Sequence, residues 1–306
     1  MRNLVLVLRD QLDRNAAVLN DADPAHDVVA MTEADVHRGR YPEHKQRLAL
    51  GFAAMRHFRD DLRDRGFTVH YEPADAAEAS GDVAPFLRRQ IETHAPERVH
   101  VTEPGRHDLR ASIETVCEDL DCPLTVHADT HFLSSHDTFE EWAEGRKELT
   151  LEYFYRERRR DHDVLVTDDG DPVGGSWNFD ESNRESFGSD GPGMVPEGPT
   201  FERDETTTAA LDLVETHFAD APGALDAFRW PVTPAQARTA LNDFIEHRLP
   251  HFGTYQDAMW TGRAFLYHSR LSAALNLKLL DPLTAVRAAE EAYHDGHAPL
   301  NAVEGF

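Results

Sequence analysis

Short apolar runs alternate with helical patterns over the first 130 residues, and this alternation limits the possible folds more than any other feature of the chain. Leu4–Leu8 is apolar throughout, which is typical of a strand buried on both faces. Strands that alternate with helices are joined by right-handed crossovers. The sequence therefore predicts an α/β domain, a Rossmann-like parallel five-stranded sheet with helices on both faces, with these expected strands: Leu4–Leu8, Val28–Met31, Thr68–Tyr71, Arg98–Thr102 and Leu124–His127.

The rest of the chain is predicted to be a connector followed by helices. Residues 139–163 show a helical pattern rich in arginine and aromatics, and residues 170–208 contain glycine pairs but few aliphatic side chains. After Thr208 only helical patterns occur. The predicted domains are 1–130, a connector at 131–208 and a helical part at 209–306, with these expected helices: Ala209–Phe218, Pro234–Arg248, Tyr255–Ala258, Arg270–Asn276 and Pro282–His294.

The charge of the chain is strongly negative. Its 306 residues include 56 acidic and 31 basic side chains, for a formal charge of −25, and only Lys45, Lys147 and Lys278 are lysines. An acidic tail would concentrate the carboxylates, whereas here they are spread along the chain. We interpret the composition as adaptation to a salt-rich, halophilic cytoplasm, where screening weakens repulsion between carboxylates. Under that interpretation the negative charge does not exclude binding to nucleic acid.

Cysteine content and hydropathy bear on the compartment. Two cysteines, Cys117 and Cys122, are too few for a disulfide framework, which favours a reducing cytoplasm. No apolar run approaches the roughly 20 residues of a membrane helix, and the N-terminal apolar stretch is too short for a signal peptide. We therefore expect a cytoplasmic protein without a membrane partner.

Polar residues follow the first two predicted strands. Asp10 and Gln11 come after the first, and Thr32 and Glu33 after the second. Ligands of open α/β sheets bind at the carboxyl ends of strands, so these residues indicate a ligand crevice, although Asp10 would equally suit a turn cap. No glycine-rich phosphate loop is present, which argues against an ordinary dinucleotide or triphosphate site here.

Two other groups of residues leave alternatives open. Of the closest histidine pairs only His247 and His251 have helical spacing, and Pro250 interrupts them, so scattered surface histidines are favoured over a metal site. Tyr153–Arg160 is the one strong basic cluster. Its arginines and aromatics would suit stacking on bases and pairing with phosphates, or simply form an amphipathic helix with the aromatics packed inward.

The segment His268–Pro282 points to a phosphate group. Ser269 and Ser272 stand three residues apart at a predicted helix start, where their hydroxyls and the backbone N–H groups would hold a phosphate or pyrophosphate. The alternative, Ser269 as a simple helix cap, explains one serine but not the whole segment.

His268–Ser272 resembles the Thr-Ser-x-Leu-Ser motif with which the photolyase/cryptochrome superfamily holds the pyrophosphate of FAD. The wider match is to its prokaryotic photolyase-related branch, the iron–sulfur bacterial cryptochromes and (6-4) photolyases. The matching pieces run from end to end of the chain: Leu4–Leu12, Ala54–Phe58, Val101–Gly105, Phe132–His136, Glu152–Glu157, Val173–Asp180, Gln256–Met259, His268–Ser272 and Ala298–Phe306.

The resemblance implies two cofactors. Its helical domain would hold a U-shaped FAD through these matching positions: Tyr255, His268, Ser269, Leu271, Ser272 and Asn276. Its α/β domain would hold an antenna chromophore, a ribityl-lumazine (6,7-dimethyl-8-ribityllumazine), at these strand-end positions: Asp10, Gln11, Leu12, Glu33 and Tyr41. Lys278 replaces a glycine that is usual in the FAD motif, where its cation would either reach the pyrophosphate or crowd it.

The resemblance also implies a reaction and a departure from it. Reduced flavin excited by blue light would give an electron to a pyrimidine dimer flipped out of UV-damaged DNA, and the branch matched implies that this dimer is a (6-4) photoproduct. In the family the helical domain continues beyond Glu304-Gly305-Phe306 and carries the cysteines of an iron–sulfur cluster, which Cys117 and Cys122 cannot replace. We therefore expect a truncated chain, or one completed by a separate C-terminal half, that alone binds FAD weakly and repairs nothing.

Other functions fit some of the same residues. A cryptochrome-like blue-light receptor, or an antenna-binding module without repair activity, would carry every motif named above. An inactive remnant would carry them too. An unrelated α/β nucleotide-binding protein with a helical appendix is disfavoured by Gly174–Asp180 and His268–Ser272.

Overall fold

The computed structural model describes residues 2–34, 42–76 and 82–306, and these form two compact units. The first unit contains Met1–His131, Thr200–Pro234 and Asn276–Leu279. The second contains Phe132–Pro199, Ala235–Leu275 and Leu280–Phe306. Each unit is described by itself below, and the division of the sequence at 130 and 208 stays a prediction.

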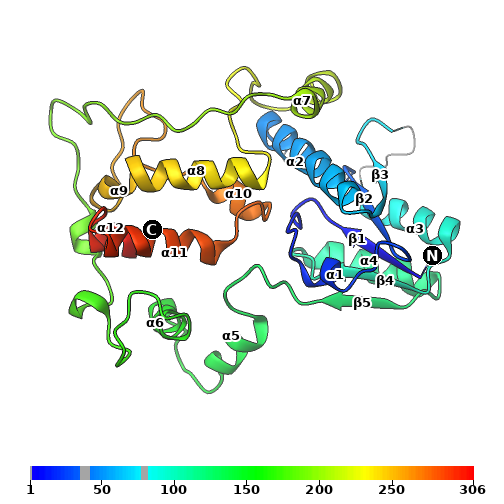
Figure 1. Ribbon diagram of the computed structural model, residues 1–306, viewed down its shortest axis with the longest axis horizontal. Helices are drawn as coiled ribbons and strands as arrows, with labels where there is room; N and C mark the ends of the chain where they lie inside the picture. The colour runs from blue at the N-terminus through cyan, green and yellow to red at the C-terminus, as the bar shows by residue number, and fades with distance from the viewer. Residues whose placement is uncertain (1, 35–41, 77–81) are drawn as a thin grey trace. The chain divides into compact units, whose positions relative to one another are not determined.

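The first unit is built on the predicted parallel sheet. Its strands lie in the order β3-β2-β1-β4-β5, and every neighbouring pair is parallel (Figure 1). β1 is central because its apolar run tolerates burial on both faces. The five expected strands are confirmed to within one residue at each end: β1 (Asn3–Val7), β2 (Val28–Thr32), β3 (Thr68–Glu72), β4 (Arg98–Thr102) and β5 (Leu124–His127).

Helices cover both faces of this sheet. Leu4 and Leu6 of β1 belong to the same buried cluster as Phe86 and Ile113, which come from helices α3 and α4. Val5 and Val7 point to the opposite face, where right-handed crossovers place α2. The helices of this unit are α1 (Ala17–Asn20), α2 (Lys45–Asp64), α3 (Val83–His94), α4 (His107–Asp119) and α7 (Glu205–His217).

Helix α7 packs along α2. The rings of Phe52 and Phe218 lie 5.9 Å apart between centroids, and the Lys45 Nζ lies 3.3 Å from a carboxylate oxygen of Glu215. The N-terminus of α7 is capped by Asp204, which accepts a hydrogen bond from the backbone N–H of Thr207. These contacts place α7, which follows the connector in sequence, against the α/β fold.

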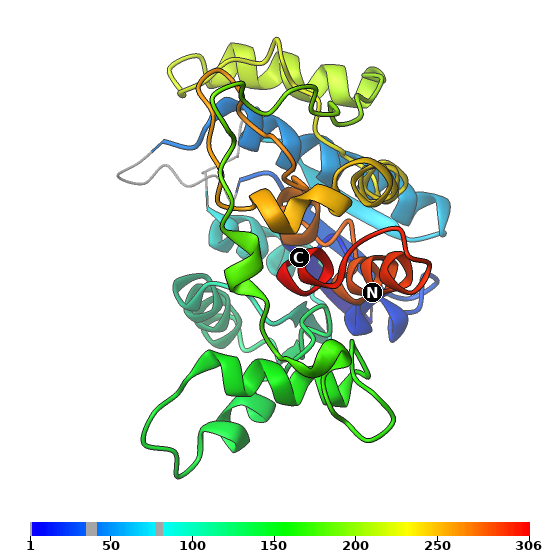
Figure 2. The same cartoon turned by 90° about the vertical axis from the view of Figure 1, so that its left-hand side faces the viewer.

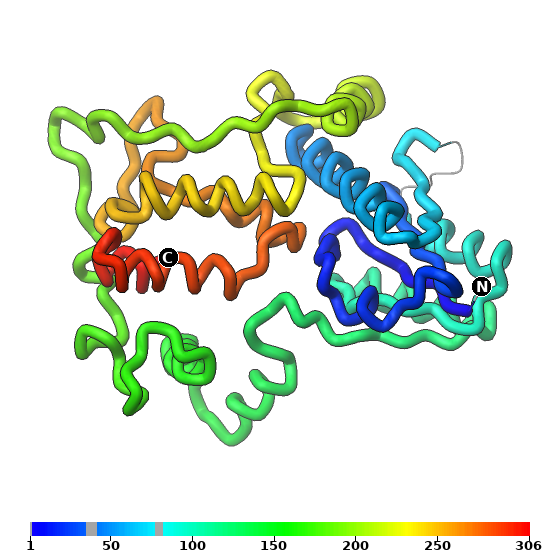
Figure 3. Tube along the Cα trace, in the orientation of Figure 1, coloured from blue at the N-terminus to red at the C-terminus, as the bar shows by residue number. Residues whose placement is uncertain are grey.

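The second unit is helical. α8 and α11 lie side by side in Figure 1 and are seen nearly end-on next to each other in Figure 2. Figure 3 follows the largely irregular stretch between α6 and α7, which contains only two short 3₁₀ turns, η1 and η2. The elements of this part are α5 (His136–Ala143), α6 (Leu151–Asp161), η1 (Val173–Gly175), η2 (Asp180–Asn183), α8 (Pro234–His247), α9 (Leu249–Tyr255), α10 (Ser272–Asn276), α11 (Pro282–His294) and α12 (Leu300–Gly305).

The predicted helix at Tyr255–Ala258 is wrong. The helix there is α9, which begins at Leu249 with Pro250 in its first turn and ends at Tyr255. Proline suits a first helical turn, because the N–H that it lacks has no intrahelical partner there. Gly253 fits α9 against α12, since a Cβ added there would lie 2.5 Å from the Cα of Ala302.

Three further helix boundaries differ from the sequence prediction, and the first is that of α7, which begins at Glu205 rather than at the expected Ala209. The helical pattern at 139–163 is divided into α5 and α6, and Gly145 between them has φ = 72°, a left-handed conformation that ends a helix. The predicted helix Arg270–Asn276 begins only at Ser272, because Arg270 has φ = 59°. Among the described residues, no helix is long and apolar enough to cross a membrane.

Candidate functional site

Gln11 joins the carboxyl ends of β1 and β4. Its Nε2 donates to the carbonyl oxygens of Thr102, at 2.8 Å, and Glu103, at 3.3 Å, while its Oε1 accepts from the N–H of Leu8 at 3.3 Å. The side chain is buried. Both ends of the amide are therefore used to hold two strand ends in place.

The neighbours of Gln11 differ in exposure. Asp10 is exposed, and its Oδ2 lies 3.5 Å from the position that a Cβ on Gly105 would take. Leu12 is fully buried, and its N–H donates to the carbonyl oxygen of Leu277 at 3.3 Å. Of these strand-end residues, Asp10 is the one whose side chain faces solvent. Tyr41, predicted to contribute to the same site, lies outside the described residues.

Glu33 is the centre of a buried polar network after β2. Its Oε1 accepts from Arg56 Nε and from the Tyr71 hydroxyl, each at 2.6 Å. Its Oε2 accepts from Arg56 Nη2 at 3.1 Å and from the Ala74 N–H at 2.9 Å. Burial, and then the charge of Glu33, raises the pKa of the Tyr71 hydroxyl well above its usual value, so Tyr71 stays protonated and keeps donating.

Arg56 and Tyr71 are the members of this network that the sequence patterns did not single out. A usable signal was present, because Arg56 directly follows Met55 within the most deeply buried stretch of α2. An arginine in such a place is rarely left without a carboxylate partner. The network also shows that the carboxylate of Glu33 is held by protein groups on both oxygens.

The segment predicted to hold phosphate has one buried anchor and several exposed polar side chains. Leu271 is only 1% exposed, whereas His268, Ser272 and Asn276 are exposed. The Leu271 N–H points to Ser269 Oγ at 3.5 Å. The segment thus fixes its backbone through Leu271 and presents hydroxyl and amide groups outward, which fits the donor set that a phosphate requires.

Tyr255 is held in an aromatic stack. Its ring lies 4.6 Å from that of Phe187 with an interplanar angle of 20°, and 5.9 Å from that of Tyr267 with an angle of 24°. Offset stacks of this kind fix ring orientation. Tyr255 is thereby immobilised in the second unit, with one edge available at a partly exposed position.

Lys278 is engaged inside the first unit. Its Nζ lies 2.5 Å from Asp129 Oδ2, and the two side chains are only 7% and 16% exposed. Its backbone has φ = 61°, in the left-handed region that glycine adopts most easily. The left-handed backbone conformation at Lys278 explains why a glycine is usual at this position of the FAD motif. The ion pair directs the lysine cation to Asp129.

The arginines of α6 are occupied by protein groups. Arg159 donates to the carbonyl oxygens of Val164, Leu165 and Trp177, and it is buried. The guanidinium carbons of Arg159 and Arg160 lie 5.0 and 4.5 Å from the centroid of the Trp177 ring. These contacts favour the interpretation of Tyr153–Arg160 as an amphipathic helix over that of a base-stacking surface.

The cysteines and histidines form no metal centre in the part of the chain that the structure describes. Burial raises the pKa of Cys117 to about 12, which keeps the thiol protonated. His100 and His127 pair with each other, with 2.8 Å between Nδ1 and Nε2, and His127 Nδ1 lies 4.0 Å from Asp21 Oδ2.

Comparison with known proteins agrees with the resemblance seen in the sequence. Residues 5–230 match the family described as deoxyribodipyrimidine photo-lyase-related protein. The chain is 42% identical, over all 306 residues, to a (6-4) photolyase of Agrobacterium fabrum, of which it covers 60%. The chain thus spans about three fifths of the length of that relative.

The fold also resembles a solved photolyase. The structure of a bacterial class III photolyase from Agrobacterium tumefaciens superposes with a TM-score of 0.57 and 15% identity, covering 100% of this chain and 56% of that one. At this identity the likeness concerns the fold alone. Because the family model matches residues 5–230, the chain belongs to the deoxyribodipyrimidine photo-lyase-related protein family.

Proposed function

We propose that this chain takes part in blue-light-driven, FAD-dependent repair of (6-4) photoproducts in UV-damaged DNA. The observation that carries the proposal is the 42% identity over the whole chain to a (6-4) photolyase. Because the chain covers 60% of that relative, it would supply the antenna domain and the first part of the flavin-binding domain.

The flavin phosphates would be held by the segment from His268 to Asn276. Leu271 is buried and anchors the backbone, while the hydroxyl of Ser272 and the amide of Asn276 are on the exposed side. His268 and Ser269 would complete the donor set. Lys278 would contribute indirectly, by tying the chain after this segment to Asp129. FAD, when bound, supplies a light-excitable electron donor.

Tyr255 would border the flavin site. Its ring is held against those of Phe187 and Tyr267, so little conformational entropy would be lost when a cofactor packs against its edge. The substrate in this proposal is a pyrimidine dimer flipped out of the duplex, for which the protein supplies orientation and a pocket.

The antenna chromophore, a ribityl-lumazine in this proposal, would lie at the carboxyl ends of β1 and β2. Asp10 is the exposed residue there and would contact it directly. Gln11, Leu12 and Glu33 are buried and bonded within the protein, so they would act by fixing the strand ends around it. A parallel sheet offers its ligand site at this edge.

A chimera tests the function. In it, this chain replaces the matched segment of the Agrobacterium (6-4) photolyase, so that the remaining part of that relative completes the protein. We expect the chimera to convert an oligonucleotide containing a (6-4) photoproduct to intact bases under blue light, and to leave it unchanged in the dark. The unaltered relative is the positive control.

Two results would contradict the proposal. A folded chimera that binds FAD but repairs no lesion would point to a light receptor or antenna module. A folded chimera that binds no FAD would contradict the proposal that the segment His268–Asn276 holds the flavin phosphates.

A further inference from the structure

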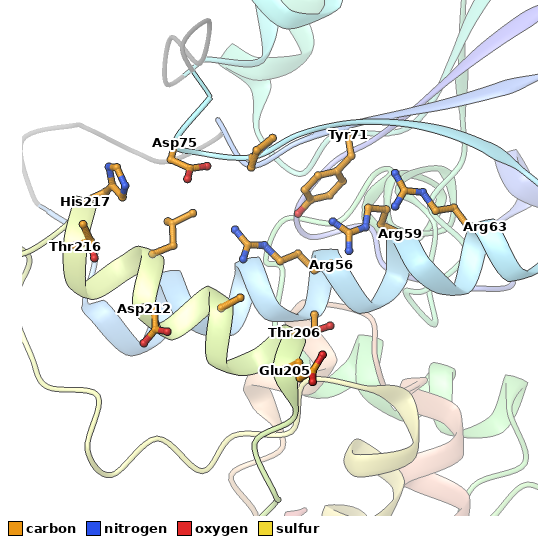
Figure 4. Close-up of a pocket in the computed structure, with 13 residues that line it drawn as sticks. Arg56, Arg59, Arg63, Tyr71, Asp75, Glu205, Thr206, Asp212, Thr216 and His217 are labelled. Carbon is orange, nitrogen blue, oxygen red and sulfur yellow. The ribbon is translucent and has the colours of Figure 1, made fainter.

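The first unit contains a groove that the proposed repair function does not use. It is formed between α2, the end of β3 and α7, and it has a volume of about 760 Å³ (Figure 4). Sites for small molecules commonly occupy 300–1,000 Å³. None of the residues assigned above to the flavin or the antenna lines it.

One end of the groove is cationic. Arg56, Arg59 and Arg63 come from α2 at spacings of three and four residues, which puts them on one face of that helix. Figure 4 shows the three side chains extending from α2 toward the space below β3. Glu33 and Asp60 pair with Arg56 and Arg59, so the three guanidinium groups leave about one net positive charge at this end of the groove, in a chain of charge −25.

The three arginines differ in how firmly they are held. Arg56 is fixed by Glu33, and Arg59 by two hydrogen bonds of 2.8 Å to Asp60. Arg63 is exposed, and its contacts with Asp60 and the carbonyl oxygen of Val69 are both 3.5 Å long. Two cations are thus preorganised, and the third can turn toward a ligand at little cost.

A flat surface adjoins these cations. The guanidinium of Arg59 lies over the Tyr71 ring, 4.9 Å from its centroid, and the Tyr71 hydroxyl is fixed to Glu33. A guanidinium held on an aromatic ring presents its other face for stacking. Pro73 and Leu213 add apolar surface to the lining.

The other end of the groove carries hydrogen-bond acceptors. Asp75 and His217 lie near each other there in Figure 4, away from Arg63. Glu205 and Asp212 also line the groove. These carboxylates disfavour a polyanion such as DNA, and they favour a small ligand with one localised anionic group and hydroxyl or amino donors elsewhere.

We propose that this groove binds a free nucleoside monophosphate. The phosphate would pair with Arg63 and with the part of the Arg59 guanidinium that Asp60 does not use, and charge-assisted bonds of this kind are among the strongest in proteins. The base would stack on the guanidinium of Arg59. The ribose hydroxyls or the base amino group would donate to Asp75, as sugar hydroxyls do to carboxylates in nucleotide-binding folds.

Calorimetric titration of the full chain tests the proposal. The probes are adenosine 5′-monophosphate, adenosine and inorganic phosphate. We expect the monophosphate to bind, and adenosine and phosphate each to bind at least about tenfold more weakly, because each lacks half of the contacts. Equal affinity for adenosine and its monophosphate, or no heat of binding up to millimolar monophosphate, would overturn the proposal.

Variants of Arg63 test whether the monophosphate binds in this groove. Arg63→Gln is expected to weaken binding of the monophosphate by about tenfold or more, and Arg63→Lys to recover part of the loss. Arg65→Gln is the matched control, because Arg65 lies at the end of the same helix, bonds to the Arg14 carbonyl and does not line the groove. Arg63 is exposed, so its replacement should not prevent folding.

The same variants can also contradict the proposal. Undiminished binding by Arg63→Gln would mean that the monophosphate binds elsewhere, the flavin segment included, and would overturn the proposal. An equal loss in Arg65→Gln would do the same, because it would report only the reduced positive charge of α2. Tighter binding of single-stranded DNA than of the monophosphate would identify a nucleic-acid surface instead.

Discussion

Replacing either partner of the Lys278–Asp129 ion pair should destabilise the first unit, but by different amounts. The pair is 2.5 Å long, and its side chains are 7% and 16% exposed, so each charge depends on the other for solvation. Asp129→Asn leaves a buried ammonium without its carboxylate, and we expect a loss of about 3 kcal/mol, at the low end of the range for broken buried pairs.

Lys278→Gly should cost less, about 1–2 kcal/mol, for two reasons. Asp129 would keep the hydrogen bond that its Oδ1 accepts from the His131 N–H at 3.1 Å. The change also removes a left-handed non-glycine residue, with φ = 61°, whose strain is about 1 kcal/mol. Lys278→Met is the matched control, because it removes the charge while keeping the strain and most of the apolar stem.

Native-state hydrogen exchange of β1 and β5 amides measures these losses within the first unit. The double variant, which has neither charge, should lose only about 1 kcal/mol, giving a coupling energy of about 3 kcal/mol or more between the two sites. A coupling below about 0.5 kcal/mol would refute the reasoning, since additive effects are the rule for independent sites. So would a Lys278→Gly variant less stable than Asp129→Asn.

Three other predictions follow from the fold and composition. Glu33→Gln should destabilise the first unit by about 3–5 kcal/mol, measured by urea unfolding, because it leaves the buried Arg56 unpaired; Glu103→Gln, at a more exposed pair, is the control. Burial, and then a neighbouring histidine in each case, lowers the pKa values of His94 and His100 below 6.5. The free energy of unfolding should therefore be highest above pH 6.5 and fall as the pH drops through that value. A flat profile of the free energy of unfolding between pH 7 and 5 would contradict this. If the charge of −25 reflects salt adaptation, circular dichroism should show unfolding on dialysis into low salt and recovery in molar KCl, and full structure in low salt would disprove the interpretation.

The sheet was predictable from the sequence because its determinants are local. A run such as Leu4–Leu8 carries its own signature of burial on both faces, and the alternation with helical patterns then leaves few topologies. The helix boundaries were less predictable, because they depend on single backbone conformations. The left-handed φ of Arg270 delays the start of α10, and an arginine at that position gives no warning of it.

The partners of the candidate site residues were not predictable, because they lie far away in the sequence. Gln11 bonds to Thr102, and Lys278 to Asp129, across separations of 91 and 149 residues. Rules based on the spacing of residues in the sequence cannot identify partners that are so far apart. Patterns identified Gln11 and Glu33 as polar residues at strand ends, but only the fold shows that their polar atoms are used by the protein itself.

The central claim is that the segment around Ser269 and Ser272 holds the phosphates of a flavin cofactor, and flavin fluorescence tests it most directly. Riboflavin and FAD share the light-absorbing ring, but only FAD carries the pyrophosphate. Titration of the purified chain should therefore give tighter binding of FAD than of riboflavin, even where both are weak. The preference should disappear in the Ser269→Ala/Ser272→Ala double variant. Equal affinity of the unaltered chain for the two flavins, or an undiminished preference in the double variant, would contradict the claim.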